Sequence, residues 1–197
     1  SKGVYDALIG EIPVEDAVVH TKYGDVLPSN KALAGAGVEL IAMDRREFLL
    51  KDALARLKDR YDFLFIDCPP SLELLTLNAL CAADSILVPV QGEYYALEGL
   101  SDLMNTVRIV RRSLNPQLEL DGVLLTMFDG RTNLALQVAE EVKHYFPGKV
   151  YATVIPRNVR LSEAPSHGKP ITAYDRTSRG AEAYTAFAAE FLKKQSA

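Results

Sequence analysis

A short run of residues in the first third of the chain ends in a carboxylate that could serve a metal–nucleotide site. The run is Tyr61–Ser71, and its apolar part, Phe63–Ile66, is too short for a typical helix but suits a strand buried on both faces. Asp67 follows directly, and the prolines after it continue neither a strand nor a helix. In nucleotide hydrolases an acid at the carboxyl end of a central strand orients Mg²⁺ and its waters. The alternative is that Asp67 only caps a helix beginning near Ser71.

Segments that fit strands alternate with segments that fit helices along the chain. We expect strands at residues 38–43, 63–67, 85–91, 122–127 and 150–155. We expect helices at residues 4–9, 14–19, 48–61, 72–83, 97–114, 133–146 and 178–194. Strands joined through crossover helices predict an α/β fold, a doubly wound and mostly parallel sheet with helices on both faces. Because no linker interrupts the alternation, residues 1–197 are expected to form a single domain.

Polar residues gather in the turns that follow the expected strands. The carboxyl ends of parallel strands meet at one edge of a sheet, so these turns are expected to converge on one rim. Residues 156–180 also carry five basic side chains against two acidic ones, a net charge of about +3. The whole chain has a net charge of −4, which excludes a protein that coats nucleic acid over its entire surface. A local basic surface on the rim is therefore expected.

The composition favours a globular protein of the cytoplasm. A chain of 197 residues with 48% hydrophobic and 24% charged residues can build one full-sized core. No apolar stretch approaches the roughly 20 residues that span a bilayer, and the acidic start does not resemble a signal peptide. Cys68 and Cys81 lack a metal-ligand spacing and are expected to be reduced thiols.

Taken in order, the turns resemble those of the ParA/Soj family of chromosome- and plasmid-partitioning ATPases. The similarity is dense in the segments YDFLFIDCPPSLELLTLNAL, VPVQGEYYALEGL, LLTMFDGRTNL, VIPRNVRLSEAPSHGKPI and SRGAEAY, and looser over residues 1–50. The resemblance implies a P-loop type fold, ATP hydrolysis with Mg²⁺, and an ATP-dependent homodimer that binds DNA without sequence preference. It also implies a ParB-type centromere-binding partner and a cytoplasmic, nucleoid-associated location without membrane attachment.

The resemblance assigns a role to the acid and its neighbours. Asp67 falls on the Walker B acid, which holds Mg²⁺ through a water and acts in catalysis. Cys68, Pro69 and Pro70 belong to the adjoining switch segment. The family's KGGVGKT-type phosphate loop is not found in the sequence, since neither of its Gly-Lys pairs is followed by Ser or Thr. We therefore expect an N-terminally truncated family member that, as the 197-residue polypeptide alone, neither holds ATP and Mg²⁺ nor hydrolyses ATP.

The resemblance also implies the remaining site residues, which form two sets. Those expected to surround the adenine are Thr126, Met127, Pro156, Arg157 and Asn158. Those expected to bind DNA are Arg131 and Arg160, whose guanidinium groups can grip phosphates; the ordinary alternative for both is a solvated or ion-paired arginine on the surface.

Two other interpretations of the whole chain stay open. One is a non-catalytic module of the same fold that acts only by binding DNA or protein. The other is a relative of the MinD-type cell-division ATPases, which share the fold but end in a basic amphipathic membrane-targeting helix; no such extension follows Gln195.

Overall fold

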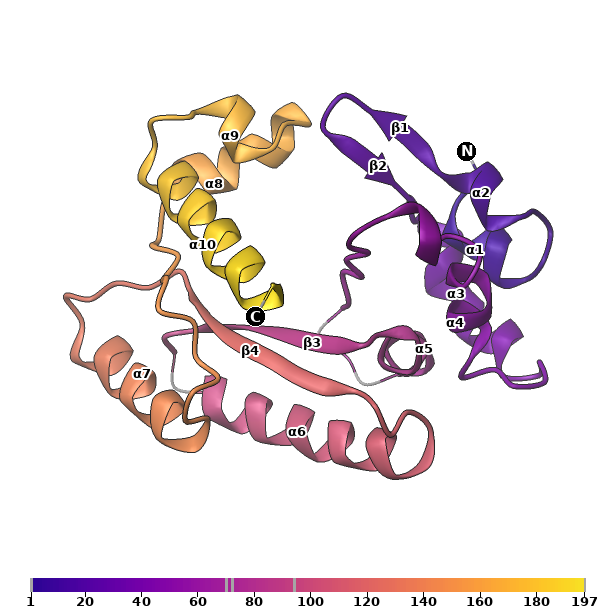
Figure 1. Cartoon of the computed structure of the whole chain (residues 1–197), viewed down its shortest axis with the longest axis horizontal. Coiled ribbons are helices and arrows are strands. Elements are labelled where there is room, and N and C mark those ends of the chain that lie inside the picture. Colours follow the sequence, from indigo (N-terminus) through magenta and orange to yellow (C-terminus); the bar gives the residue numbers. More distant parts are fainter. Residues whose placement is uncertain (1, 70, 72, 94, 197) are drawn as a thin grey trace. The chain divides into compact units, whose positions relative to one another are not determined.

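The computed structural model describes residues 2–69, 71, 73–93 and 95–196 (Figure 1). The chain divides into two compact units, each with its own core. The first unit consists of Ser1–Asp84 and Asn105–Glu119, and the second of Ser85–Met104 and Leu120–Ala197.

The first unit is mostly helical. Its helices are α1 (Val4–Leu8), α2 (Val14–Ala17), α3 (Lys31–Leu40), α4 (Leu49–Leu54), the 3₁₀ turn η1 (Lys58–Arg60) and α5 (Leu74–Ala82). Strands β1 (Val19–Thr21) and β2 (Gly24–Val26) form an antiparallel hairpin. The core of this unit buries Leu8, Ala36, Leu40, Leu50 and Ala79.

A buried asparagine of α5 ties α5 to α4. Asn78 is 1% exposed. Its side-chain oxygen accepts a hydrogen bond from the Leu50 backbone N–H at 3.1 Å, and its amide nitrogen donates to the Arg46 carbonyl at 2.7 Å. A buried carboxamide needs such partners to offset its desolvation, so it fixes the register of the two helices.

The prediction of a strand at residues 38–43 is wrong, because this segment lies in or just after α3. Asn30 begins the helix, and its side-chain oxygen accepts a hydrogen bond from the Ala32 N–H at 2.9 Å. Leu33, Ala36 and Leu40 then follow at helical spacings of three and four and pack into the first core. An apolar run of this length fits either a strand or a helix, and the Asn30 cap favours the helix here.

The buried strand expected at residues 63–67 is also not found. In the described part of the chain, residues 63–67 belong to neither of the two sheets. The side chains of Phe63, Leu64 and Phe65 are 42%, 40% and 73% exposed, so the prediction of burial on both faces is wrong. A strand needs a neighbour both for its backbone hydrogen bonds and to cover its side chains.

The second unit has a parallel sheet at its centre. Its strands are β3 (Ser85–Gln91) and β4 (Glu119–Thr126), which are neighbours, and its helices are α6 (Ala96–Ser113, shared with the first unit), α7 (Asn133–Tyr145), α8 (Val159–Glu163), η2 (Ala164–His167), α9 (Ile171–Tyr174) and α10 (Arg179–Gln195). The helix α6 crosses over between the two strands. The fold is therefore α/β.

The segment 150–155, predicted as a strand, runs beside β4 through isolated parallel bridges instead. One bridge joins Val123 to Val150, and further along Ile155 N–H donates to the Leu125 carbonyl at 2.9 Å. Between these points the N–H groups of Ala152 and Thr153 donate to the carboxylate of Glu190 in α10, at 2.7 and 2.8 Å. A helix side chain thus satisfies this exposed edge in place of another strand.

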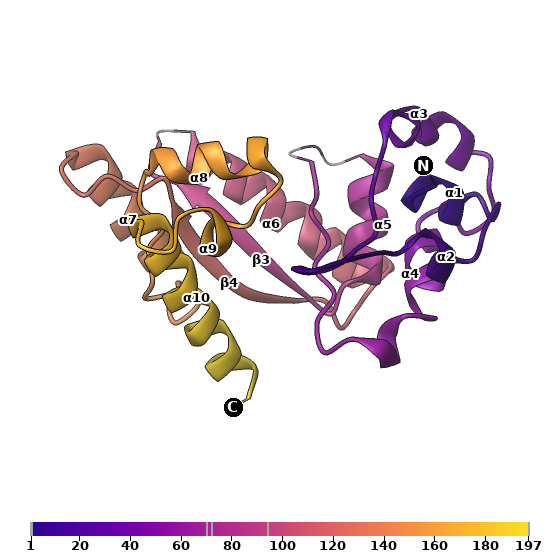
Figure 2. The same ribbon diagram turned by 90° about the horizontal axis from the view of Figure 1, so that it is seen from above.

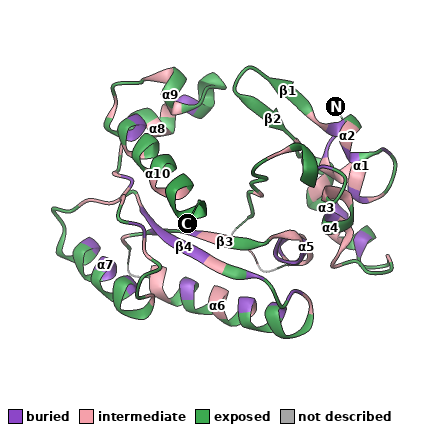
Figure 3. Cartoon of the chain, viewed as in Figure 1, coloured by how far each residue is buried: buried purple, intermediate pink, exposed green. Residues whose placement is uncertain are grey.

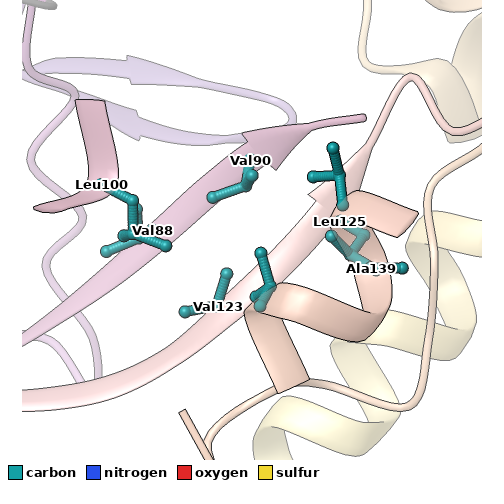
Figure 4. Packing of buried hydrophobic residues seen from close by; sticks show 8 residues of the cluster. Val88, Val90, Leu100, Val123, Leu125 and Ala139 are labelled. Atoms are coloured by element: carbon teal, nitrogen blue, oxygen red, sulfur yellow. The ribbon is translucent and has the colours of Figure 1, made fainter. Parts of the chain in front are cut away.

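Helices cover both faces of this sheet. Val123 and Leu125 of β4 pack with Leu100 of α6 and Ala139 of α7, and Figure 4 shows this cluster. Leu124, between them in sequence, packs instead against the side of α10. Figures 1 and 2 accordingly show α7 and α10 on opposite sides of the sheet, and Figure 3 shows most of β4 buried.

Candidate functional site

The two segments predicted to surround the adenine lie side by side in the second unit. The Phe128 N–H donates to the Ile155 carbonyl at 3.0 Å, and the Arg157 N–H donates to the Phe128 carbonyl at 3.3 Å. Thr126 and Met127 directly precede Phe128, so this backbone pairing brings them next to the loop of residues 156–158. The predicted grouping is therefore present, and its role towards a nucleotide stays a prediction.

Met127 turns the chain at the end of β4. Its φ is +47°, in the left-handed region that non-glycine residues seldom adopt. Its side chain is 43% exposed. Such strain concentrates at ligand sites, and the sequence gives no signal of it because glycine or asparagine is the residue expected there.

Asn158 organises the other segment. Its side-chain oxygen accepts a hydrogen bond from the Arg160 backbone N–H at 2.9 Å and so caps α8. The oxygen is thereby committed to the helix, and its amide NH₂ is the group with which Asn158 would donate to a ligand. Pro156, which pairs with Phe128, and the exposed Arg157 complete this segment.

Arg131 is held by an acid of its own loop. Its Nε donates to Asp129 Oδ1 at 2.8 Å, and its Nη2 donates to Asp129 Oδ2 at 2.7 Å. The hydrogen bonds from Arg131 lower the pKa of Asp129 to about 2. The Arg131 side chain is 89% exposed, whereas that of Asp129 is 28% exposed.

Arg160 is held in a similar way. Its Nη1 donates to Glu163 Oε2 at 2.8 Å, and its Nε lies 3.4 Å from Asp175 Oδ2. The Tyr174 hydroxyl donates to the same Glu163 oxygen at 3.0 Å. Hydrogen bonds from Arg160 and then Tyr174 lower the pKa of Glu163. Both arginines are thus ion-paired, as the ordinary alternative anticipated.

The partner acids Asp129, Glu163 and Asp175 were not among the residues predicted from the sequence. A weak signal for two of them exists, since Asp129 precedes Arg131 by two residues and Glu163 follows Arg160 by three.

Asp67 belongs to the first unit. Its side chain and that of Pro69 are exposed, and Pro70 lies outside the described residues. Cys68 is exposed too, and its Sγ lies 3.7 Å from the Ile66 carbonyl. Desolvation of the sulfur and the charge of Asp67 raise the pKa of this thiol. The helix-cap alternative for Asp67 is wrong, because α5 begins after Glu73.

An exposed single acid fits the way in which Mg²⁺ is usually held with nucleotides. Mg²⁺ keeps several waters and binds one or two carboxylates plus substrate phosphates, and not an all-protein cage. In the described part of the chain no group of three or more His, Cys, Asp or Glu side chains could form such a cage. The described helices also include none long and apolar enough to span a membrane.

Comparison with known proteins identifies the family. A family model described as an AAA domain matches residues 1–120. The sporulation initiation inhibitor protein Soj of Bacillus subtilis is 60% identical over 189 residues, which cover 95% of this chain and 75% of Soj. The chromosome partitioning protein ParA of Caulobacter vibrioides is 50% identical over 196 residues, which cover 98% of this chain and 73% of ParA.

Solved structures agree on the fold. A Mycobacterium smegmatis protein described as cobyrinic acid a,c-diamide synthase, with bound ADP and magnesium, is 36% identical with a TM-score of 0.83, over 100% of this chain and 73% of that one. The cell division ATPase MinD of Pyrococcus furiosus is 27% identical with a TM-score of 0.74, over 98% of this chain and 76% of MinD. Identities of 50% and 60% to ParA and Soj exceed the 27% to MinD. This chain belongs to the ParA/Soj family of chromosome-partitioning ATPases.

Proposed function

We propose that this protein acts in chromosome or plasmid partitioning as an ATPase whose ATP-bound homodimer binds DNA without sequence preference and responds to a ParB-type partner. Its place of action would be the nucleoid in the cytoplasm. The names of the Soj and ParA relatives support the process. The observation that carries the nucleotide part is the backbone pairing of Phe128 with Ile155 and Arg157, which places both predicted adenine segments together.

In this proposal the loop residues hold the base and the acid serves the phosphates. Thr126 and Met127 would contact one side of the adenine, and the loop of residues 156–158 the other, with the Asn158 NH₂ as a donor to a ring nitrogen. Asp67 would accept a hydrogen bond from a water of the Mg²⁺ shell and orient it. Mg²⁺, when bound, would supply positive charge that neutralises the phosphates.

A nucleotide-binding assay tests the base site. Asn158→Ala would weaken binding of a fluorescent ATP analogue, while Asn133→Ala, on the exposed start of α7, would not. Binding that is unchanged by Asn158→Ala would remove the base site from this proposal, whereas absence of binding from every variant at millimolar nucleotide is the result expected if the polypeptide alone does not hold ATP.

We further propose that the 197-residue polypeptide alone does not hydrolyse ATP, because its sequence holds no recognisable phosphate loop. The backbone N–H groups and the lysine of that loop supply most of the phosphate binding in related enzymes. Phosphate release by the purified polypeptide is expected to equal that of a protein-free control. Turnover above this background that disappears in Asp67→Ala would disprove the proposal.

DNA binding is the third part of the proposed function. Arg131 and Arg160 would contact phosphates, so each alanine variant should weaken binding to any duplex. It should also lower the magnitude of the slope of log binding constant against log salt concentration by about 1. Binding that needs ATP would support the partitioning cycle. Salt-dependent binding without nucleotide would favour the non-catalytic module instead.

A further inference from the structure

Each arginine proposed to contact DNA is bound by a carboxylate close to it in the sequence, Arg131 by Asp129 of its loop and Arg160 by Glu163 of the helix α8. From this we infer that Asp129 and Glu163 compete with DNA phosphate for Arg131 and Arg160, and thereby set a low DNA affinity for the surface. The inference rests on the proposed DNA-binding function and concerns its regulation. It differs from a positioning role, in which the same acids would hold the arginines ready and strengthen DNA binding.

The geometry at Arg131 favours competition. Asp129 takes Nε and Nη2, the edge of the guanidinium that grips a phosphate with two parallel hydrogen bonds. A DNA phosphate must therefore displace Asp129 to use this edge. The pair also cancels the charge that would attract DNA over a distance.

The acid is the fixed member of this pair. Asp129 Oδ1 also accepts a hydrogen bond from the Arg131 backbone N–H at 3.1 Å, and the Asp129 carbonyl accepts one from the Thr132 N–H at 3.1 Å. Thr132 in turn caps α7 through the Ala135 N–H. The Arg131 side chain, 89% exposed, can swing towards a phosphate while Asp129 keeps its backbone partner.

The geometry at Arg160 repeats the arrangement on the helix α8. Glu163 keeps a donor, the Tyr174 hydroxyl at 3.0 Å, when Arg160 moves away. Asp175 accepts backbone and side-chain hydrogen bonds from Thr177, at 3.2 and 3.0 Å, and so keeps partners as well. Displacement by phosphate thus leaves neither acid unpaired, which lowers its cost.

The direct test is a double-mutant cycle on DNA affinity with the full 197-residue chain. Asp129→Asn retains an oxygen for the Arg131 backbone N–H and removes only the charge. Because exposed ion pairs are weak, Asp129→Asn is expected to tighten binding of a mixed-sequence duplex by about threefold to tenfold at low salt. The gain should vanish in the Arg131→Ala background, since no guanidinium remains to be released.

A second cycle and a control complete the design. Glu163→Gln should likewise tighten binding in the parent and not in Arg160→Ala. The control is Glu141→Gln, which removes an exposed acid of α7 in the same unit. Its effect should stay below about twofold, because it has no arginine to release.

Each outcome decides one statement. Weaker binding by Asp129→Asn would show a positioning role and overturn the inference. An equal gain in the Arg131→Ala background, or in Glu141→Gln, would show a general charge effect and also overturn it. If the arginine variants bind DNA like the parent, the proposed DNA function of these residues fails. Absence of DNA binding by every variant, measured with and without ATP and Mg²⁺, would reject both the proposed DNA-binding function and the inferred competition by the acids.

Discussion

Tyr151 donates its hydroxyl to the buried carboxylate of Asp121 and so joins the segment beside β4 to that strand. The same carboxylate accepts a hydrogen bond from Gln195 Nε2 at 2.8 Å and lies 3.5 Å from Lys194 Nζ. Lys194 also lies over the Tyr151 ring, 4.8 Å from its centroid. Burial and the bond to Asp121 raise the pKa of Tyr151. One acid therefore holds the C-terminal end of α10.

Removal of the Tyr151 hydroxyl should destabilise the protein. Tyr151→Phe takes a donor from a buried charge, and we expect a loss of about 1–3 kcal/mol in the free energy of unfolding. Urea unfolding followed by circular dichroism measures this change in the free energy of unfolding. Tyr145→Phe, at a side chain 65% exposed, is the control and should change little. Equal effects of the two substitutions would contradict the role of Asp121.

A methyl group at Gly180 should be costly, and Leu161 should be the reason. A Cβ at Gly180 would lie 2.6 Å from Leu161 Cγ, whereas one at Gly99 meets nothing within 4 Å. Gly180→Ala is expected to destabilise by about 1–3 kcal/mol. Gly99→Ala, also in a helix, is expected to stabilise by about 0.5–1 kcal/mol. In a Leu161→Ala background the cost of Gly180→Ala should largely disappear; an unchanged cost would refute the steric explanation.

The ion pair at Asp129 predicts an unusual titration. Its pKa is lowered from the ordinary 3.8 to about 2. A lowered folded pKa means that the stabilising contribution is present above pH 3.8 and is lost as the pH falls towards about 2. Carbon-13 NMR of the side-chain carboxyl should show a midpoint of about 2, which rises towards 3.8 in Arg131→Ala. A midpoint that Arg131→Ala leaves in place would show that the ion pair does not form in solution.

Glu190 should make the stability of the second unit depend on pH. Burial disfavours its charge, but hydrogen bonds from Thr153 and Ala152 and the charge of Lys194 outweigh this, so the pKa of Glu190 is lowered. Its stabilisation is therefore present above the ordinary value of 4.5 and is lost as the pH falls through the lower folded pKa. The unfolding free energy of the parent should fall more steeply below pH 4.5 than that of Glu190→Gln. Parallel curves of unfolding free energy against pH for the two proteins would contradict this role of Glu190.

Long periodic segments were predictable from the sequence. The strand expected at 85–91 is β3, and the helices expected at 97–114, 133–146 and 178–194 are α6, α7 and α10 within one or two residues at each end. Over such lengths the spacing of apolar side chains matches only one secondary structure. The family resemblance assigned the two adenine segments, and the expectation that turns after parallel strands meet at one edge agreed with their grouping.

Short apolar segments were not predictable in the same way. Residues 38–43 and 63–67 were both expected to be strands, yet the first lies in or just after α3, and the second belongs to neither sheet of the described chain and exposes Phe63, Leu64 and Phe65. The conformation of a few apolar residues depends on a distant cap or a neighbouring strand, which periodicity does not encode. The acids that pair with Arg131 and Arg160 were not predicted either, since an acid two or three residues away is common in any sequence.

The sequence by itself determined the longer helices and strands, the ParA/Soj family and the residues that gather on the loops after β4 and after residue 155. Only the tertiary structure decided which charge meets the buried Asp121, because its partner Lys194 is 73 residues away in the chain. Local periodicity reports which face of an element is apolar. Whether an arginine is held by an acid depends on distances of a few ångströms that only the folded chain sets.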